Sequence, residues 1–143
     1  MSYFSSIKEH SGFTHFVVLL TRILVGLGMI FLHGLPKLER LMGNDEVKFY
    51  SFVGLGAENT LILATVLEMV AGFLIMIGLF TRGASLILIA VMSVAAFAVH
   101  SGDPVSVREA SLLYFTIFLM ILALGPRKYS VDALISKRGG SKW

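Results

Sequence analysis

The stretch LILATVLEMVAGFLIMIGLF, residues 61–80, decides the fold class of this chain. A helix needs about 20 mostly apolar residues to cross the roughly 30 Å hydrocarbon core of a bilayer. This run has that length, and Glu68 is its only charge. A charge inside a membrane span is costly, so it needs a partner or a function. The stretch therefore predicts a membrane-spanning helix in which the carboxylate of Glu68 has a partner or a function.

The composition of the whole chain agrees with a membrane protein. Its 143 residues are 56% hydrophobic and 15% charged, with a mean hydropathy of +0.83. An ordinary soluble domain has roughly 45–50% apolar and about 25% charged residues. We expect four spans near residues 13–33, 59–80, 83–100 and 107–124. The sequence thus predicts an all-α membrane protein, a four-transmembrane-helix bundle that forms a single domain over residues 1–143.

The distribution of basic residues predicts the orientation of the bundle. With four spans both termini lie on one side, and short loops rich in Lys and Arg favour the cytoplasm. The basic residues on the side of the termini are Lys8, Arg82, Arg127, Lys128, Lys137, Arg138 and Lys142. Fewer basic residues, diluted by acidic ones, fall on the other side. We therefore expect cytoplasmic termini. The first run exceeds the roughly 7–15 apolar residues of a signal peptide, which indicates a retained span.

The segment between the first two spans, residues 34–58, alternates apolar and charged residues. Asn44 can cap a helix whose first turn holds Asp45 and Glu46, which suits the helix dipole. We expect a short interfacial helix here, lying along the outer surface of the membrane.

Two charges inside the spans are expected to meet. Arg22 lies near the middle of the predicted first span, and Glu68 is nine residues beyond Asn59 in the second, roughly 14 Å along the helix. An Arg22–Glu68 ion pair at similar depth follows from this placement. It could serve a function, or it could only fix the register of the helices.

Other polar residues are expected to gather at the outer end of the bundle, above that pair. They are His33, Lys37, His100, Arg108 and Glu109. Each also has a structural interpretation: histidines bonded to loop carbonyls, basic side chains reaching the interface, and Glu109 favoured at a helix N-terminus. No spacing typical of a metal site is present, so no metal is predicted.

The order of these residues resembles the DoxX family of small four-helix bacterial membrane proteins. The resemblance is carried by Arg22 with Gly26, Phe31 with His33, Gly34 and Lys37, Glu68 with Gly72, Gly78-Leu79 with Thr81-Arg82, Glu109, and Gly125-Pro126 with Ser130 and Asp132. Arg127 departs from the Gly-Pro-Gly of many members, which affects only the shape of the final turn. The match covers nearly the whole chain in order.

The resemblance implies a multi-pass protein of the bacterial inner membrane associated with quinone-linked redox complexes. The chain contains no cysteine, which removes thiolate chemistry and iron–sulfur ligation, so electrons would come from a redox partner subunit. We expect quinone or another apolar small molecule to bind around Arg22, Glu68, His33, Lys37, His100 and Glu109. Nothing assigns catalysis to this polypeptide itself, and scattered basic residues do not indicate nucleic acid.

Three alternatives stay open. The protein could be a scaffold or assembly factor in which the buried charges are structural. His33 and His100 could be axial haem ligands, which is the weaker interpretation because no firm haem pair is evident. A transporter would require a homo-oligomer, because four helices leave little room for a pathway and no inverted repeat is evident.

Overall fold

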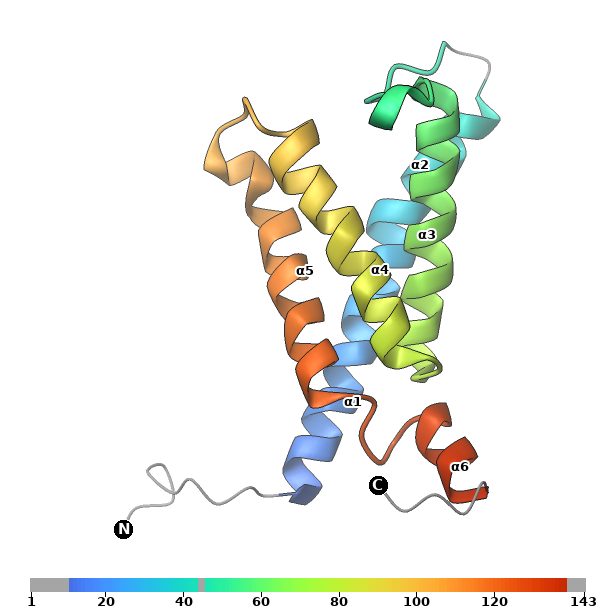
Figure 1. Cartoon of the computed structure of the whole chain (residues 1–143), viewed down its shortest axis with the longest axis vertical. Helices are drawn as coiled ribbons and strands as arrows, with labels where there is room; N and C mark the ends of the chain where they lie inside the picture. Colours follow the sequence, from blue (N-terminus) through green and yellow to red (C-terminus); the bar gives the residue numbers. More distant parts are fainter. Residues whose placement is uncertain (1–10, 44–45, 139–143) are drawn as a thin grey trace.

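The computed structural model describes residues 11–43 and 46–138, which form a bundle of helices (Figure 1). In chain order these are α1 Ser11–Gly28, η2 Met29–Gly34, α2 Leu35–Met42, η3 Phe52–Gly54, α3 Ala57–Ile77, α4 Thr81–Val94, η4 Ala95–Val99, α5 Val105–Leu124 and α6 Val131–Arg138. Two of them, η2 and η4, are π-helices, and η3 is a single 3₁₀ turn. The described residues contain no β-strand, so the predicted all-α class is confirmed.

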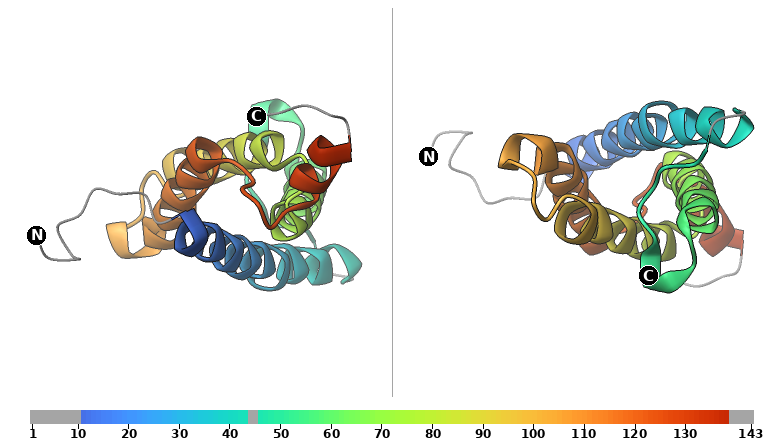
Figure 2. Two further views of the ribbon diagram at one scale, coloured as in Figure 1. Left: turned by 90° about the horizontal axis from the view of Figure 1, so that it is seen from below. Right: turned by 90° about the horizontal axis from the view of Figure 1, so that it is seen from above.

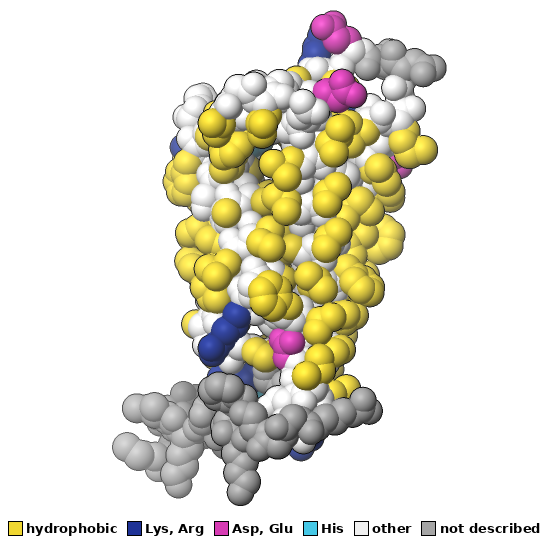
Figure 3. Space-filling model, turned by 45° about the vertical axis from the view of Figure 1, so that its right-hand side comes forward, with side chains coloured by type: hydrophobic (Ala, Val, Ile, Leu, Met, Phe, Trp, Pro, Cys, Tyr) yellow, Lys and Arg dark blue, Asp and Glu magenta, His cyan; other side chains and the backbone are white. Residues whose placement is uncertain are grey.

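Among the residues that the structure describes, four helical segments are long and apolar enough to span a membrane, as the sequence predicted. They are Gly12–Met42, Ala57–Ile77, Thr81–Val99 and Val105–Leu124. Apolar side chains cover the middle of the face in Figure 3, while charged side chains lie mostly toward its two ends. This distribution matches a bilayer core flanked by aqueous interfaces.

The first span is longer than predicted. It runs for 31 residues and ends at Met42 rather than His33, which corresponds to about 46 Å of helix. Pro36 lies in the first turn of α2, directly after the π-helix η2. Proline has no backbone N–H to donate, and its ring crowds the preceding turn. A π-helix has a wider turn than an α-helix, so it leaves more room before the proline. The chain therefore stays helical past Pro36 and carries Lys37 on the same rod.

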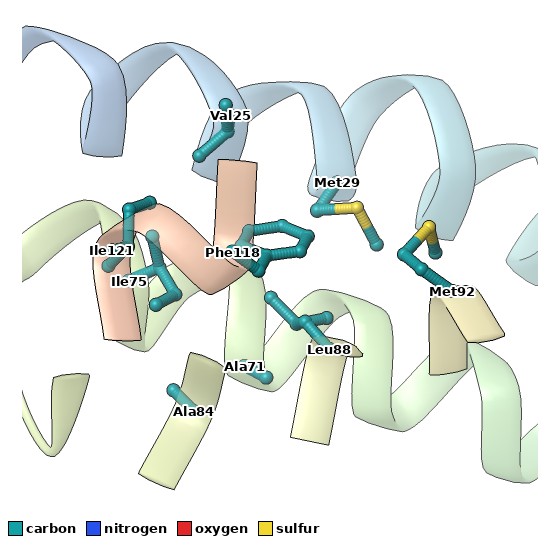
Figure 4. Close-up of a cluster of buried hydrophobic side chains, with 9 residues drawn as sticks. All are labelled: Val25, Met29, Ala71, Ile75, Ala84, Leu88, Met92, Phe118 and Ile121. Carbon is teal, nitrogen blue, oxygen red and sulfur yellow. The ribbon is translucent and has the colours of Figure 1, made fainter. Parts of the chain in front are cut away.

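The spans surround a common centre, with α1 and α4 on opposite sides (Figure 2). Each of them packs against both α3 and α5. The buried side chains between them are Val25, Met29, Ala71, Ile75, Ala84, Leu88, Met92, Phe118 and Ile121 (Figure 4). Phe118 is fully buried at the middle of this cluster. Dispersion contacts among these side chains hold the helices together, since lipid gives little hydrophobic drive for helix association.

A glycine contact fixes how α1 and α3 slide against each other. A Cβ added to Gly26 would lie 2.7 Å from the carbonyl oxygen of Gly72, and one added to Gly72 would lie 2.9 Å from Cβ of Met29. Such small residues allow helix backbones to approach closely inside membranes. Because the helices are antiparallel, this contact also decides which residues share a depth. Arg22 packs against Gly78, whereas Gly34 packs against Met69.

The link between the first two spans differs from the prediction. Asn44 and Asp45 lie outside the described residues, and residues 46–51 are not helical. Val47 and Phe49 are half-buried while their neighbours are exposed, the period-2 pattern of an extended chain. The expected interfacial helix is therefore wrong over this stretch. Helix α2 ends at Met42, and only the 3₁₀ turn η3 follows.

Two helices lie together at the end of the bundle opposite this link. Helix α1 begins there, and α6 lies at the same end (Figure 1). Helix α6 was not predicted, because its eight residues carry no apolar periodicity strong enough to mark it. It positions the C-terminal residues that contact Arg22, as described next.

Candidate functional site

A buried ion pair joins the first two spans. Lys37 Nζ lies 2.6 Å from Glu68 Oε2, and the Glu68 side chain is only 3% exposed. Glu68 is the twelfth of the 21 residues of α3, so the pair lies about halfway along that span. Lys37 Nζ also donates to the carbonyl oxygen of His33, at 3.3 Å. The ammonium group therefore bridges a side chain of α3 and the backbone of η2.

The predicted Arg22–Glu68 ion pair is wrong. Glu68 binds Lys37, and Arg22 donates instead to the carbonyl oxygen of Tyr129. Arg22 packs against Gly78, which is ten residues, roughly 15 Å of helix, from Glu68. The prediction assumed that the first span ends near His33. Because this span continues to Met42, Arg22 lies nearer its N-terminal end, and Lys37 reaches the middle of α3.

An aromatic contact extends this polar site to α5. The rings of His33 and Tyr114 meet edge to face, with centroids 5.0 Å apart. Tyr114 is the tenth of the 20 residues of α5, again halfway along a span. Its hydroxyl lies directly against Gly28, where any Cβ would overlap it. The sequence analysis missed Tyr114, although a tyrosine within the fourth apolar run was a usable signal.

The site has hydrogen-bonding capacity that the described chain does not use. Within the described part of the chain, the Lys37 ammonium uses two of its three donors, and Glu68 Oε1 accepts no hydrogen bond. The His33 ring and the Tyr114 hydroxyl likewise make none within residues 11–43 and 46–138. Hydrocarbon cannot satisfy such groups. We call Lys37, Glu68, His33 and Tyr114 the midspan site.

The other two predicted site residues lie elsewhere. His100 Nδ1 is 2.7 Å from Asp103 Oδ2 in the exposed turn between η4 and α5. Glu109 is exposed on the first part of α5. Neither forms a hydrogen bond or an ion pair with Lys37, Glu68 or His33. The expected outer cluster is therefore not assembled by direct contacts.

A groove of about 540 Å³ lies where the end of the first span, the link after it and the first half of α3 meet. Its lining residues are Pro36, Glu39, Arg40, Gly43, Glu46, Val47, Lys48 and Leu61. Leu61 is 1% exposed and lies seven residues, two helical turns, before Glu68 on α3. The groove and the midspan site thus both include a residue of α3, and these two residues lie two helical turns apart.

Arg22 belongs to a second polar cluster, at the end of the bundle that holds α6. We call Arg22, Gly78, Tyr129 and Asp132 the inner cluster, after the predicted orientation. The Arg22 side chain is fully buried and reaches the carbonyl oxygen of Tyr129 and the backbone of Gly78. The N–H of Asp132 donates to the carbonyl oxygen of Gly78 at 2.9 Å. Arg22 and Asp132 therefore hold the C-terminal segment on the turn between α3 and α4. Arg22 Nε and Nη1 are buried and make no hydrogen bond within residues 11–43 and 46–138.

Asp132 also supplies the cap of α4. Its carboxylate accepts hydrogen bonds from the backbone N–H groups of Phe80 and Thr81, at 2.8 and 2.9 Å, and from Thr81 Oγ1 at 2.8 Å. Replacing a helix cap by alanine typically costs about 1 kcal/mol, up to about 2. We expect Asp132→Ala to lower the free energy of unfolding of the detergent-purified protein by that amount or slightly more.

The matched control is Asp103→Ala, which removes a carboxylate from an exposed ion pair worth little. Thermal unfolding followed by size-exclusion chromatography measures both variants. An Asp132→Ala protein as stable as the Asp103→Ala protein would contradict the capping role.

The fold and the midspan site together define a class: a four-span α-helical membrane protein with a buried Lys–Glu pair beside an aromatic pair. The family model for DoxX matches residues 17–101, and the chain belongs to the DoxX family. The matched region includes Arg22, His33, Lys37 and Glu68 and ends before α5, which contributes Tyr114. The searches of curated proteins and of solved structures gave no match.

Proposed function

We propose that this protein binds quinone or a similar lipophilic molecule at the midspan site and works as a membrane subunit with a redox partner. The observation that supports this is the unused hydrogen-bonding capacity around Lys37 and Glu68 in the middle of the spans. Ionisable residues inside a membrane are expensive and usually mark a site of function. A bound ligand would satisfy groups that neither lipid nor the described chain satisfies.

The chemistry of these residues suits a quinone. Lys37 can donate to a carbonyl oxygen, as can Tyr114 and the protonated nitrogen of the His33 ring. Glu68 can carry a proton, which quinone reduction consumes together with electrons. The chain has no cysteine, and in our proposal the electrons come from a partner subunit that holds the redox cofactor. The role of this chain is then to bind and orient the ligand.

The proposed location is the bacterial inner membrane, with both termini in the cytoplasm. Exposed Arg82, Lys128 and Lys137 belong to the end of the bundle that holds α6 and the start of α1. Basic residues in short loops favour the cytoplasmic side. The outer groove and the His100–Asp103 pair would then face the periplasm.

The test is ligand binding by the purified protein and a double variant. We expect the wild type in mild detergent to bind a decyl-tailed benzoquinone or its hydroquinone, measured by equilibrium dialysis. Lys37→Met/Glu68→Met removes both charges together and should weaken binding of both forms by about tenfold or more, the loss of at least one charge-assisted hydrogen bond.

Thr116→Val is the control, because Thr116 is exposed on α5 and its hydroxyl donates to the carbonyl oxygen of Leu112 at 2.9 Å. It should bind as the wild type does. No binding of either form by the wild type would sink the proposal. Binding that survives unchanged in the double variant would move the ligand away from the midspan site.

A scaffold or assembly factor is the second candidate, and the inner cluster favours it. Arg22 and Asp132 connect α1, the α3–α4 turn and the C-terminal segment through contacts within the chain. A scaffold would keep its partner in the Lys37→Met/Glu68→Met variant and would bind no quinone. Co-purification of the same partner with both proteins distinguishes the two functions.

A further inference from the structure

We infer that the midspan site recognises a hydroxyl group at the head of a lipophilic molecule, and therefore binds a hydroquinone in preference to a quinone. This inference rests on the proposed function and adds the redox form of the ligand. It follows from which hydrogen-bonding positions of Lys37 and Glu68 are already used and which are open.

The open positions are of opposite kinds. A carboxylate only accepts hydrogen bonds, and Glu68 uses Oε2 for Lys37 while no group of the described residues donates to Oε1. An ammonium only donates, and Lys37 keeps one of its three donors. The two groups are joined at 2.6 Å, so one small group can reach both. That group must donate to Glu68 and accept from Lys37.

Head groups differ in how well they meet this requirement. A quinone carbonyl or a methyl ether only accepts, so either would leave Glu68 Oε1 without a donor. A hydroxyl both donates and accepts. A charged group in a low-dielectric site that lacks a hydrogen-bond partner costs free energy, because it has lost the hydrogen bonds that water would give it. The paired site therefore favours a hydroxyl over a carbonyl of the same size.

Nearby rings favour a phenolic hydroxyl over an aliphatic one. The Tyr114 ring lies near the rings of His33 and Phe118, with centroids 5.0 and 6.0 Å away. A pair of aromatic rings gains stabilisation beyond the burial of its apolar area, and a phenol brings a ring that can pack against these. An aliphatic alcohol offers the same hydroxyl but no ring, so the two sources of hydroxyl can be separated by experiment.

The experiment compares four probes on the full-length protein in detergent under anaerobic conditions. They are a decyl-tailed benzohydroquinone, the corresponding quinone, the hydroquinone dimethyl ether and 1-decanol. We expect the wild type to bind the hydroquinone about tenfold more tightly than the quinone or the ether, as one charge-assisted hydrogen bond gives. Decanol should bind more weakly than the hydroquinone.

A single variant tests the role of Glu68. In Glu68→Gln the amide N–H can donate to a carbonyl, so the preference for hydroquinone over quinone should fall to about equal or reverse. Thr116→Val, which leaves the site intact, should keep the wild-type preference. A Glu68→Gln protein with the full wild-type preference would overturn the assignment.

Each remaining outcome is informative. Equal binding of hydroquinone, quinone and ether by the wild type would overturn hydroxyl recognition and leave the proposed function standing. Tighter binding of decanol than of the hydroquinone would support hydroxyl recognition but overturn the hydroquinone as occupant. Binding of none of the four probes would remove the proposed function itself.

Discussion

Lys37→Met alone is expected to destabilise the protein by about 3 kcal/mol or more, whereas Lys37→Met/Glu68→Met should recover most of that loss. The physical reason is that removing one partner of a buried pair leaves an uncompensated charge, at a cost of about 3–5 kcal/mol, while removing both is often close to neutral. Glu68 is 3% exposed and has no other partner within the described chain. Thermal unfolding in detergent measures the three proteins.

Glu68→Met alone provides the matched comparison. Lys37 is 18% exposed, and its long side chain can turn toward the outer interface when Glu68 is gone. We therefore expect the stability of the Glu68→Met protein to lie between those of the Lys37→Met protein and the double variant. If Lys37→Met were as stable as the wild type, the ion pair would not form in the protein.

Gly78→Ala is expected to cost about 3 kcal/mol or more, the range of severe single substitutions. Gly78 has a φ of +72°, which costs a residue with a Cβ roughly 1–2 kcal/mol. The added Cβ would also overlap the Arg22 guanidinium and lie 2.6 Å from Cβ of Ser130. The substitution therefore combines backbone strain with disruption of the inner cluster, and it should lower the unfolding temperature and the yield of folded protein.

Gly54→Ala separates the two contributions. Gly54 has a φ of +77° but no atom within 4 Å of an added Cβ. It should show only the backbone cost of roughly 1–2 kcal/mol. Equal losses for Gly54→Ala and Gly78→Ala would mean that the contact with Arg22 contributes nothing.

The sequence predicted well what depends on local composition. Length and hydropathy located the four spans, because any apolar run of that length can cross a bilayer whatever its neighbours are. Gly26 and Gly72, which helped to carry the family resemblance, lie at a close helix contact, where small residues are common in membrane bundles. The burial of Arg22 and Glu68 also follows from their positions inside apolar runs.

The pairing of the charges could not be obtained in the same way. Which residue meets Glu68 depends on how far α1 slides along α3, and the Gly26–Gly72 contact sets that distance. The sequence shows neither this contact nor the continuation of the helix through Pro36. Tyr114 was missed because an aromatic residue in an apolar span is usually core. Its significance depends on the ring of His33, which comes from a distant part of the chain.

The cap on α4 implies an order of assembly. Asp132 follows Thr81 by 51 residues and by an entire further span. A protein emerges from the ribosome N-terminal end first, so the α3–α4 hairpin enters the membrane while the N–H groups of Phe80 and Thr81 still lack this acceptor. Only after α5 has been inserted can the last segment return to close the inner end. The C-terminal segment thus binds the α3–α4 turn last, when all four spans are in place.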